Sequence, residues 1–333
     1  MKIALDVMGG DFAPQATIQG ALQALQQADS QFEIVLVGPE EQIHTELGQT
    51  LPPKVHLHPA KEIVTMDDRG SKVLKTKPNS SLVQGIQLVK KGQVDGFISA
   101  GNTGAIMATS LLLLGRIKGV RRPALGVYIP TPKGGKILCD VGANPEAKPH
   151  HLLQFAIMAA HYLKHVEGIE TPLVGLINIG IEANKGSELY AETYQLLKTE
   201  LPHFIGNVEG RQIFTTAAHV LVCDGFVGNT LLKFAEGWIS TFGTLIKESL
   251  RERFSYQLGA YLLKPVFESI KKQYDYEEHG GTPLLGVNGV CIISHGSSSA
   301  KAIKNSLLVA KKCIEENLIE DIRRGVTQFT SEA

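Results

Sequence analysis

Hydrophobic residues along this 333-residue chain gather in short runs that are separated by longer amphipathic or Ala/Leu-rich segments. The runs are continuously apolar, which is typical of strands covered on both faces in a parallel sheet. They predict strands at residues 2–7, 32–38, 55–58, 95–100, 124–129, 136–141, 173–179, 219–224 and 289–294. The segments between them predict helices near 14–28, 40–48, 80–91, 103–115, 149–165, 184–200, 228–250 and 299–323. This alternation predicts an α/β protein with helices on both sides of a mainly parallel sheet.

No low-complexity linker and no repeat of fixed period divides the chain. Because α/β folds often reach about 250 residues or more as one unit, we expect residues 1–333 to form a single α/β/α catalytic domain. The least sheet-like part, about 250–282, is expected to be a projecting amphipathic helical hairpin within it.

The segment 251–276 has the pattern of a helix that lies on a membrane surface. Its apolar residues recur at helical spacing, with a break expected at Pro265, and basic residues flank them: Arg251, Arg253, Lys264, Lys271 and Lys272. Such helices bind anionic membranes peripherally. Leu258, Leu262 and Phe267 are the predicted membrane contacts, while dimer packing and core contact remain open alternatives.

Composition and charge exclude several classes of protein. Lys and Arg total 33, as do Asp and Glu, so no global basic field indicates nucleic-acid binding. No apolar stretch approaches the roughly 20 residues of a membrane span, and the N-terminus lacks a signal-peptide core. The four cysteines form no C-x-x-C pair. We therefore expect a cytoplasmic protein.

Glycine-rich loops follow six of the predicted strands, at residues 6–11, 99–105, 140–144, 178–186, 224–229 and 294–299. Ligands of open parallel sheets bind outside the carboxyl ends of the strands, so the six loops are expected to face one shared crevice. Glycine permits close backbone approach, and a following helix presents unpaired N–H groups and the positive end of its dipole. The pattern therefore predicts an anion site.

Within these loops, the backbone of Gly101, Asn102, Thr103 and Gly104, together with Lys185, is expected to bind phosphate. Neutral donors nearby would serve an oxygen-rich ligand or a developing oxyanion: Asn144, Asn229, Gly296 and Ser297. Asp6, Asp140 and Asp224 are possible metal ligands, but loop capping explains them better, and no metal is expected.

Motifs of rival chemistries are absent from the sequence. It contains no G-x-x-x-x-G-K-[ST], no G-x-G-x-x-G after the first strand, no G-x-S-x-G and no H-E-x-x-H. What remains is an enzyme that binds phosphate or an oxyanion and has no evident covalent nucleophile.

Eight motifs in one order resemble the bacterial acyl-carrier-protein:phosphate acyltransferases of phospholipid synthesis. They are "DVMGGDFAP", "ISAGNTGA", "RIKGVRRPA", "CDVGANPEAKPHHL", "NIGIEANKG", "NVEGR", "CDGFVGN" and "HGSSS", spanning residues 6 to 299. The resemblance implies transfer of a fatty acyl group from acyl carrier protein to inorganic phosphate, giving acyl phosphate. It also implies an isocitrate/isopropylmalate-dehydrogenase-like or phosphotransacetylase-like α/β/α fold, a homodimer and no cofactor.

The resemblance further favours Lys185 and Asn229 as the catalytic pair. Members commonly carry a hydroxyl residue where Ile181 and Val227 stand here, so a catalytic hydroxyl at either position is not expected. His295, after the last predicted strand, could protonate the leaving thiolate or bind phosphate, although a structural histidine is an equal alternative.

The run "GRIKGVRR" brings Arg116, Lys118, Arg121 and Arg122 close together. Because acyl carrier proteins are acidic, we expect Arg116, Arg121 and Arg122 to steer their docking, the alternative being a solvated helix end. The product serves a membrane enzyme, so a membrane surface or a downstream membrane acyltransferase is an expected partner. Two other functions stay open: a metal-dependent decarboxylating dehydrogenase on a related fold, and a noncatalytic anion-binding scaffold.

Overall fold

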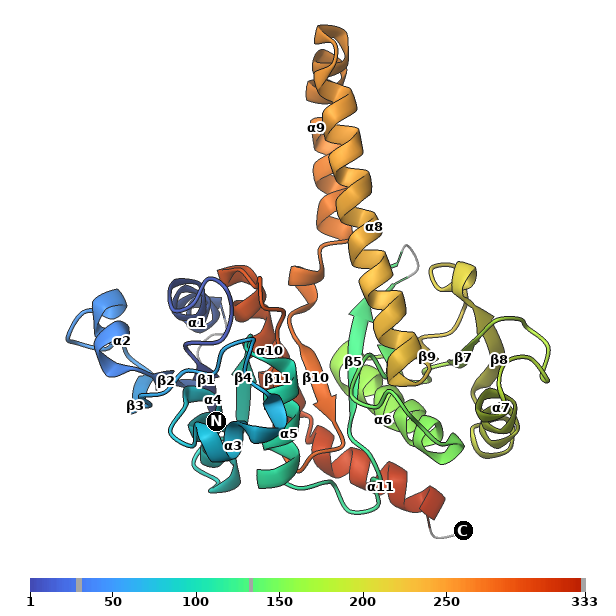
Figure 1. The fold of residues 1–333 in the computed structure, drawn as a ribbon, viewed down its shortest axis with the longest axis horizontal. Coiled ribbons are helices and arrows are strands. Elements are labelled where there is room, and N and C mark those ends of the chain that lie inside the picture. The colour runs from blue at the N-terminus through green and yellow to red at the C-terminus, as the bar shows by residue number, and fades with distance from the viewer. Residues whose placement is uncertain (28–31, 132–133, 331–333) are drawn as a thin grey trace.

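The computed structural model describes residues 1–27, 32–131 and 134–330 (Figure 1). Residue 28 lies outside these ranges, and it is the predicted end of the first helix. Residues 331–333, the end of the predicted 1–333 domain, also lie outside them. The strands are β1 (Lys2–Asp6), β2 (Glu33–Gly38), β3 (Val55–Pro59), β4 (Gly96–Ser99), β5 (Ala124–Ile129), β6 (Lys136–Cys139), β7 (Val174–Asn178), β8 (Phe204–Glu209), β9 (Val220–Val222), β10 (Thr282–Leu285) and β11 (Val290–Ile293).

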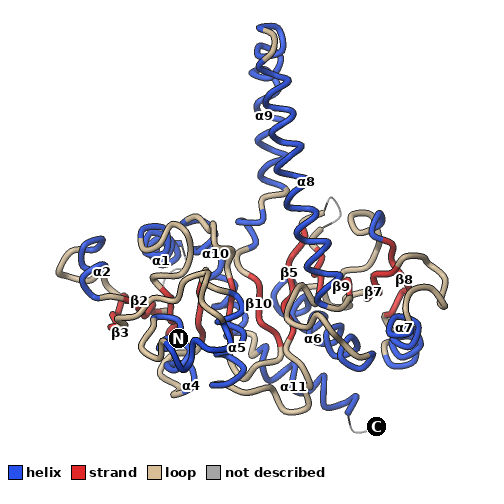
Figure 2. The backbone as a smooth tube through the Cα atoms, viewed as in Figure 1, coloured by secondary structure: helices blue, strands red, loops and turns tan. Residues whose placement is uncertain are grey.

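Helices alternate with these strands along most of the chain (Figure 2). They are α1 (Gln15–Gln27), α2 (Glu40–Leu47), α3 (Val73–Thr76), α4 (Ser81–Lys90), α5 (Thr103–Leu113), α6 (Pro149–Glu167), α7 (Glu188–Glu200), α8 (Gly225–Arg251), α9 (Phe254–Gln273), α10 (Ala300–Glu315) and α11 (Leu318–Thr330). The predicted helix 299–323 is two helices, because Asn317 turns the chain between α10 and α11 with φ of 50°.

One eleven-stranded sheet joins the two halves of the molecule in the order β3-β2-β1-β4-β11-β10-β5-β6-β9-β7-β8. All strands predicted from the sequence are present, and β8 and β10 were not predicted. β10 pairs antiparallel with β11 and with β5, and β5 pairs antiparallel with β6. The remaining neighbours are parallel. The mainly parallel α/β sheet with flanking helices is therefore confirmed.

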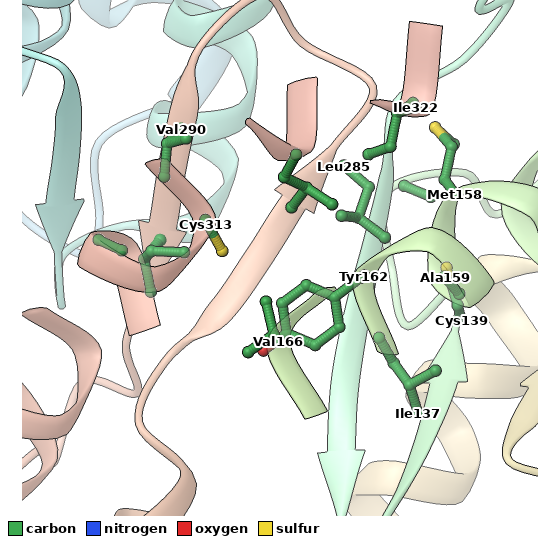
Figure 3. Packing of buried hydrophobic residues seen from close by; sticks show 14 of the residues in the cluster. Ile137, Cys139, Met158, Ala159, Tyr162, Val166, Leu285, Val290, Cys313 and Ile322 are labelled. Carbon is green, nitrogen blue, oxygen red and sulfur yellow. The ribbon is translucent and has the colours of Figure 1, made fainter. Parts of the chain in front are cut away.

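Helices bury both faces of this sheet, as the continuous hydrophobicity of the strands requires. Ile3 and Leu5 of β1 belong to a core that includes residues of α1, α6, α10 and α11, whereas Ala4 faces a second core with α4 and α5. Figure 3 shows the first core where Tyr162 and Val166 of α6 meet Ile137 of β6, and where Leu285 of β10 lies near Ile322 of α11.

Helices α8 and α9 form a hairpin that projects far from the sheet (Figure 1). Helix α8 begins at the sheet with Gly225, so the hairpin uses more of the chain than residues 250–282. The break expected at Pro265 is wrong, because α9 continues through that residue. Among the described residues, no helix is both long and apolar enough to cross a bilayer.

Candidate active site

The six glycine-rich loops form two groups of three. Loops 6–11, 99–105 and 294–299 follow β1, β4 and β11, which are neighbours in the sheet, and we call them the first loop group. Loops 140–144, 178–186 and 224–229 follow β6, β7 and β9, also neighbours, and form the second loop group. Strand direction reverses three times between β11 and β6. The two loop groups therefore follow strands that point in opposite directions, so the assumption of a single carboxyl edge for all six loops is wrong. The expected shared crevice stays a prediction.

A buried carboxylate holds the first loop group together. Asp6 is 3% exposed, and its Oδ2 accepts a hydrogen bond from Ser99 Oγ at 2.7 Å. Its Oδ1 accepts from the Met8 amide at 3.1 Å, and Ser99 Oγ accepts from the Gly101 amide at 3.0 Å. Burial raises the pKa of Asp6, although hydrogen bonds from Ser81 and Ser99 favour its ionised form. Asp6 thus crosslinks two loops and fixes the position of Gly101.

Glycines let the backbones of these loops touch. A Cβ on Gly9 would lie 2.7 Å from Ser99 Oγ and 2.8 Å from the Gly101 nitrogen. Gly10 has φ of +105°, and a Cβ there would lie 2.9 Å from the Gly296 oxygen. The Asp11 amide donates to that same oxygen at 2.7 Å. Gly101 and Gly296, two predicted phosphate-site residues, are therefore brought together around Gly9 and Gly10.

Asn102 begins helix α5. Its Oδ1 accepts from the Ala105 amide at 3.0 Å, as an N-cap does. Its side-chain nitrogen donates to the backbone oxygens of Thr65, Met66 and Asp68 at 3.2, 3.1 and 3.0 Å. The side chain of Asn102 is thus engaged by the protein. Thr103 and Gly104 are exposed in the first turn of α5, where backbone N–H groups have no partner within a helix.

His295 and Ser297 lie at the carboxyl end of β11, in the same group. The Ser297 amide donates to His295 Nδ1 at 3.2 Å, and Ser297 Oγ lies 2.8 Å from that nitrogen. The ring is exposed, so His295 lies at the surface of the first loop group.

A second buried carboxylate, Asp140, organises the second loop group. Its Oδ1 accepts from the amides of Leu125 and Ala143 at 2.9 and 3.1 Å. Its Oδ2 accepts from the backbone amide and the side chain of Asn144 at 2.6 and 2.9 Å. Asn144, 5% exposed, also donates to the Pro123 oxygen at 2.7 Å. Burial raises the pKa of Asp140. Asn144 is therefore a buried residue that holds this turn together by hydrogen bonds.

Asp224 caps helix α8 and is anchored from α7. Its Oδ1 accepts from the amides of Phe226 and Val227 at 2.9 and 3.0 Å. Its Oδ2 accepts from the Tyr190 hydroxyl at 2.7 Å. Burial and then this hydrogen bond raise the pKa of Tyr190, which keeps the phenol neutral. Tyr190 was not predicted from the sequence, where it has no feature beyond its place on a helix.

Helix α8 packs directly on the turn that Asp140 begins. A Cβ on Gly228 would lie 1.9 Å from the Asp140 carbonyl oxygen, so no side chain fits there. The next residue, Asn229, is exposed, and a Cβ on Gly142 would lie 3.8 Å from its Cβ and Cγ. Asn229 thus points outward beside the 140–144 turn, as a residue that contacts substrate must.

Lys185 lies in a loop that two asparagines hold. The side chain of Asn178 donates to the Lys185 oxygen at 2.9 Å, and the side chain of Asn207 donates to the Glu182 oxygen at 2.7 Å. The Lys185 ammonium is 3.9 Å from the Glu182 carboxylate, and its side chain is 47% exposed. Asn178 and Asn207 were not predicted as functional residues. The motif "NVEGR" contains Asn207, but nothing in the sequence indicates that β8 lies beside this loop.

The predicted site residues therefore divide between the groups. Gly101 to Gly104, His295, Gly296 and Ser297 belong to the first loop group, and Asn144, Lys185 and Asn229 belong to the second. Asp6, Asp140 and Asp224, the possible metal ligands, are all used as internal crosslinks.

The predicted docking arginines lie on the surface beside the start of α6. Arg116 donates to the Arg121 oxygen, and the Arg121 amide donates to Gln154 Oε1 at 2.8 Å, so backbone contacts fix this turn. Burial, then His150, then Arg122 and Arg121 lower the pKa of His151 to about 4. The basic surface thus continues from Arg121 and Arg122 to the N-terminus of α6.

Comparison with known proteins identifies the family. The family model described as "Fatty acid synthesis protein" matches residues 1–321. This chain belongs to that family. A phosphate acyltransferase from Desulfitobacterium hafniense (strain DSM 10664 / DCB-2) is 50% identical over 333 residues, covering 99% of both chains. A phosphate acyltransferase from Heliobacterium modesticaldum is 48% identical over 329 residues, covering 98% of both.

Solved structures share the fold. A phosphotransacetylase from Streptococcus pyogenes has a TM-score of 0.60 at 16% identity, covering 95% of this chain and 94% of that one. A 4-hydroxythreonine-4-phosphate dehydrogenase from Klebsiella pneumoniae has a TM-score of 0.54 at 13% identity, with 94% and 98% covered. The phosphotransacetylase-like fold expected from the sequence is therefore confirmed.

Proposed function

We propose that this protein transfers a fatty acyl group from the thioester of acyl carrier protein to inorganic phosphate, releasing acyl phosphate for phospholipid synthesis. The observation that carries this is the family match over residues 1–321, together with phosphate acyltransferases that are about half identical over the whole chain. The chain is accordingly a transferase, and neither the dehydrogenase nor the scaffold alternative is favoured.

Phosphate can attack the thioester carbonyl directly, because a thiolate whose conjugate acid has a pKa of about 8.5 leaves readily. The protein then has to orient the two reactants, which is worth up to roughly 7–11 kcal/mol. It must also stabilise the tetrahedral oxyanion, where removal of one donor typically costs about 3–4 kcal/mol. A covalent intermediate on the enzyme is not required.

We place the phosphate between the two loop groups. The first turn of α5, at Thr103 and Gly104, offers N–H groups and the positive end of the helix dipole. Lys185 offers the opposing cation from the second group. Asn229 is placed as donor to the thioester oxygen, and His295 as the acid that protonates the leaving thiolate. Asn144 and Ser297 hold the turns that carry these groups.

Sheet twist supports this placement. Between β4 and β9 lie five steps from strand to strand, and each step turns the strand axis by about 20–25°. The accumulated rotation of about 100–125° offsets most of the 180° reversal caused by the antiparallel strands. On this basis we expect the carboxyl ends of the two strand groups to turn toward a common side.

An assay with purified components tests the function. The protein is incubated with acyl-acyl carrier protein and phosphate, and acyl phosphate and free thiol are measured together. We expect the two products in equal amounts, with thiol release dependent on phosphate. Thiol release that needs no phosphate would indicate a hydrolase instead, and no release would contradict acyl transfer.

For acyl carrier protein, we propose docking on the surface formed by Arg116, Arg121 and Arg122. The reason is charge, since an acidic partner is steered toward a local basic patch on a protein of zero formal net charge.

We propose that the α8–α9 hairpin forms part of a homodimer interface and also contacts the membrane. Its exposed apolar residues are far more numerous than a solvated hairpin requires: Phe234, Trp238, Ile239, Phe242, Leu245, Phe254, Leu258, Tyr261, Leu262, Leu263, Val266, Phe267 and Ile270. Trp238 and Phe242 stack at 5.9 Å on α8, and we assign this stripe to a second subunit. Leu258, Leu262 and Phe267 of α9 are assigned to a peripheral contact with anionic lipid, near the membrane acyltransferase that uses the product.

A further inference from the structure

Two histidines and an aspartate that lie outside every glycine-rich loop meet where α6 packs on α11. His161 Nδ1 lies 2.6 Å from Asp321 Oδ2, and His165 Nε2 lies 2.5 Å from the same oxygen. The ligand atoms of all three residues lie within 4.8 Å of one another. We call this set the His161–His165–Asp321 cluster.

The spacing and composition of this cluster are those of a metal site. His161 and His165 are four residues apart on α6, so their rings project from one face one turn apart. Two imidazoles and one carboxylate are ligands that zinc takes at about 2.0–2.2 Å, often with water as the fourth ligand. The side chains are 26%, 20% and 29% exposed, which leaves solvent access for an ion.

Two features show that the surroundings hold the rings in place. Glu316 Oε2 lies 3.6 Å from His165 Nδ1, the nitrogen that faces away from Asp321. A carboxylate on the far nitrogen orients a metal-bound imidazole and raises its basicity. At Gly325, a Cβ would lie 2.1 Å from His161 Nε2, so the ring packs closely on this glycine and a larger residue would displace it.

From this geometry we propose that the His161–His165–Asp321 cluster binds one divalent transition metal ion, with zinc as the favoured ion. In a tetrahedral site, the nitrogen and oxygen ligands would lie about 3.3 Å apart. Each histidine therefore has to separate from Asp321 by less than 1 Å, which a small rotation of these partly buried side chains provides. The ion replaces two hydrogen bonds that share a single carboxylate oxygen.

Such an ion would fasten the last helix to the rest of the molecule. Helix α11 buries Leu318, Ile322 and Val326 in the core that it shares with α6. An ion that binds the folded chain only must stabilise it, by an amount that grows with the ion concentration. The role is therefore structural and separate from acyl transfer.

The test uses the full chain without an affinity tag. Calorimetric titration with zinc is expected to give one site per chain, and cobalt is expected to give the visible absorption of a tetrahedral complex. His161→Gln and Asp321→Asn should each weaken zinc binding at least tenfold. His56→Gln, which changes a histidine bonded only to Glu33 among the described residues, should leave it unchanged.

Circular dichroism shows whether each variant is folded, and His165→Gln replaces any that is not. Zinc should also raise the melting temperature of the unmodified chain and of His56→Gln, but not that of Asp321→Asn. Absence of stoichiometric zinc binding, or binding of equal strength in the cluster variants, would overturn the proposal and leave the cluster as a hydrogen-bonded contact between two helices.

Discussion

At the scale of single residues, the carboxylates and amides of the glycine-rich loops have two roles. Some are buried and hold the loops together by hydrogen bonds, and others face outward and are candidate contacts with substrate. Asp6, Asp140, Asn144 and Asp224 are buried and make several hydrogen bonds each. Lys185 and Asn229 are outward-facing residues of the same loops. Sequence reasoning could find the loops, because glycine spacing marks them. It could not tell the structural role of Asn144 from the candidate substrate contact of Asn229, because only tertiary contacts distinguish these two roles.

Lys185→Ala should lower the rate of acyl phosphate formation by about 10²–10³-fold, the usual effect of removing one donor that faces developing charge. The fold should be unaffected, since the ammonium is half-exposed and contacts Glu182 only at 3.9 Å. Steady-state kinetics with acyl-acyl carrier protein measure this. Lys198→Ala, an exposed lysine on α7, is the matched control, and equal activity of the two variants would remove Lys185 from the site.

Asn207 is expected to act through Lys185 by positioning its loop. Asn207→Asp removes the donor to the Glu182 oxygen at 2.7 Å and should raise the KM for phosphate more than it lowers kcat. Asn207→Gln should restore part of the loss if the amide is what matters. Unchanged phosphate kinetics in Asn207→Asp would show that the loop keeps its position without this bond.

At the scale of elements, the prediction of the sheet failed where strands were short and irregular. β10 is a central strand of four residues that contains Pro283, and proline argues against a central strand. β8 carries a register shift relative to β7, and Gly206 within it has φ of 103°. The two antiparallel pairings of β10 cancel, so the reversal between the loop groups comes from β5, which pairs antiparallel with β6. The sequence pattern predicted both strands but not their opposite directions.

The contact between α8 and the Asp140 turn can be tested with two glycines of the same helix. Gly228→Ala would place a methyl group 1.9 Å from the Asp140 oxygen, so it should destabilise the protein by about 1–3 kcal/mol or more. Gly237→Ala meets no atom within 4 Å and should be neutral or stabilising by up to about 1 kcal/mol. Urea unfolding measures both, and equal stabilities would contradict the packing described here.

The N-terminus of α6 should make stability depend on pH. His151 Nδ1 accepts from the Lys148 amide at 3.2 Å, and burial, followed by nearby cations, lowers the pKa of His151 to about 4. Between about pH 4 and pH 6.5 the unfolded chain therefore binds the proton and the folded chain does not, so stability falls as pH falls. His151→Gln should weaken this dependence in unfolding experiments, and an unchanged slope would argue against it.

At the scale of the whole molecule, a compact sheet with its helices carries a long apolar hairpin (Figure 1). The periodicity of residues 251–276 predicted its α9 arm. The sequence pattern predicted the α8 arm as a helix but not as part of the hairpin. Its first turn belongs to the loops at the sheet, and its apolar residues have the pattern of a helix that packs in the core.

Leu258→Glu should reduce co-flotation with anionic phospholipid vesicles severalfold, because it places a charge within the apolar surface of α9. Gln257→Glu adds the same charge at a neighbouring polar position and should have a smaller effect. Sedimentation of both variants shows whether the oligomer is intact. Equal flotation of Leu258→Glu and the unmodified protein would remove the membrane role from this arm.

Replacement of both Arg121 and Arg122 by Glu should raise the KM for acyl-acyl carrier protein at low salt. The kcat should change little, since the basic patch acts on the encounter of the two proteins. The difference should shrink as salt screens it. Replacement of the exposed residues Lys198 and Lys90 by Glu in one variant reverses the same number of charges elsewhere and is the control. A KM that does not respond would contradict docking at this surface.

The central claim is that phosphate is held between the two loop groups. The most direct measurement is a crystal structure of the protein soaked with phosphate. We predict one phosphate whose oxygens lie within hydrogen-bond distance of both the first turn of α5, at Thr103 and Gly104, and Lys185 Nζ. A phosphate that contacts residues of one loop group alone would contradict the account.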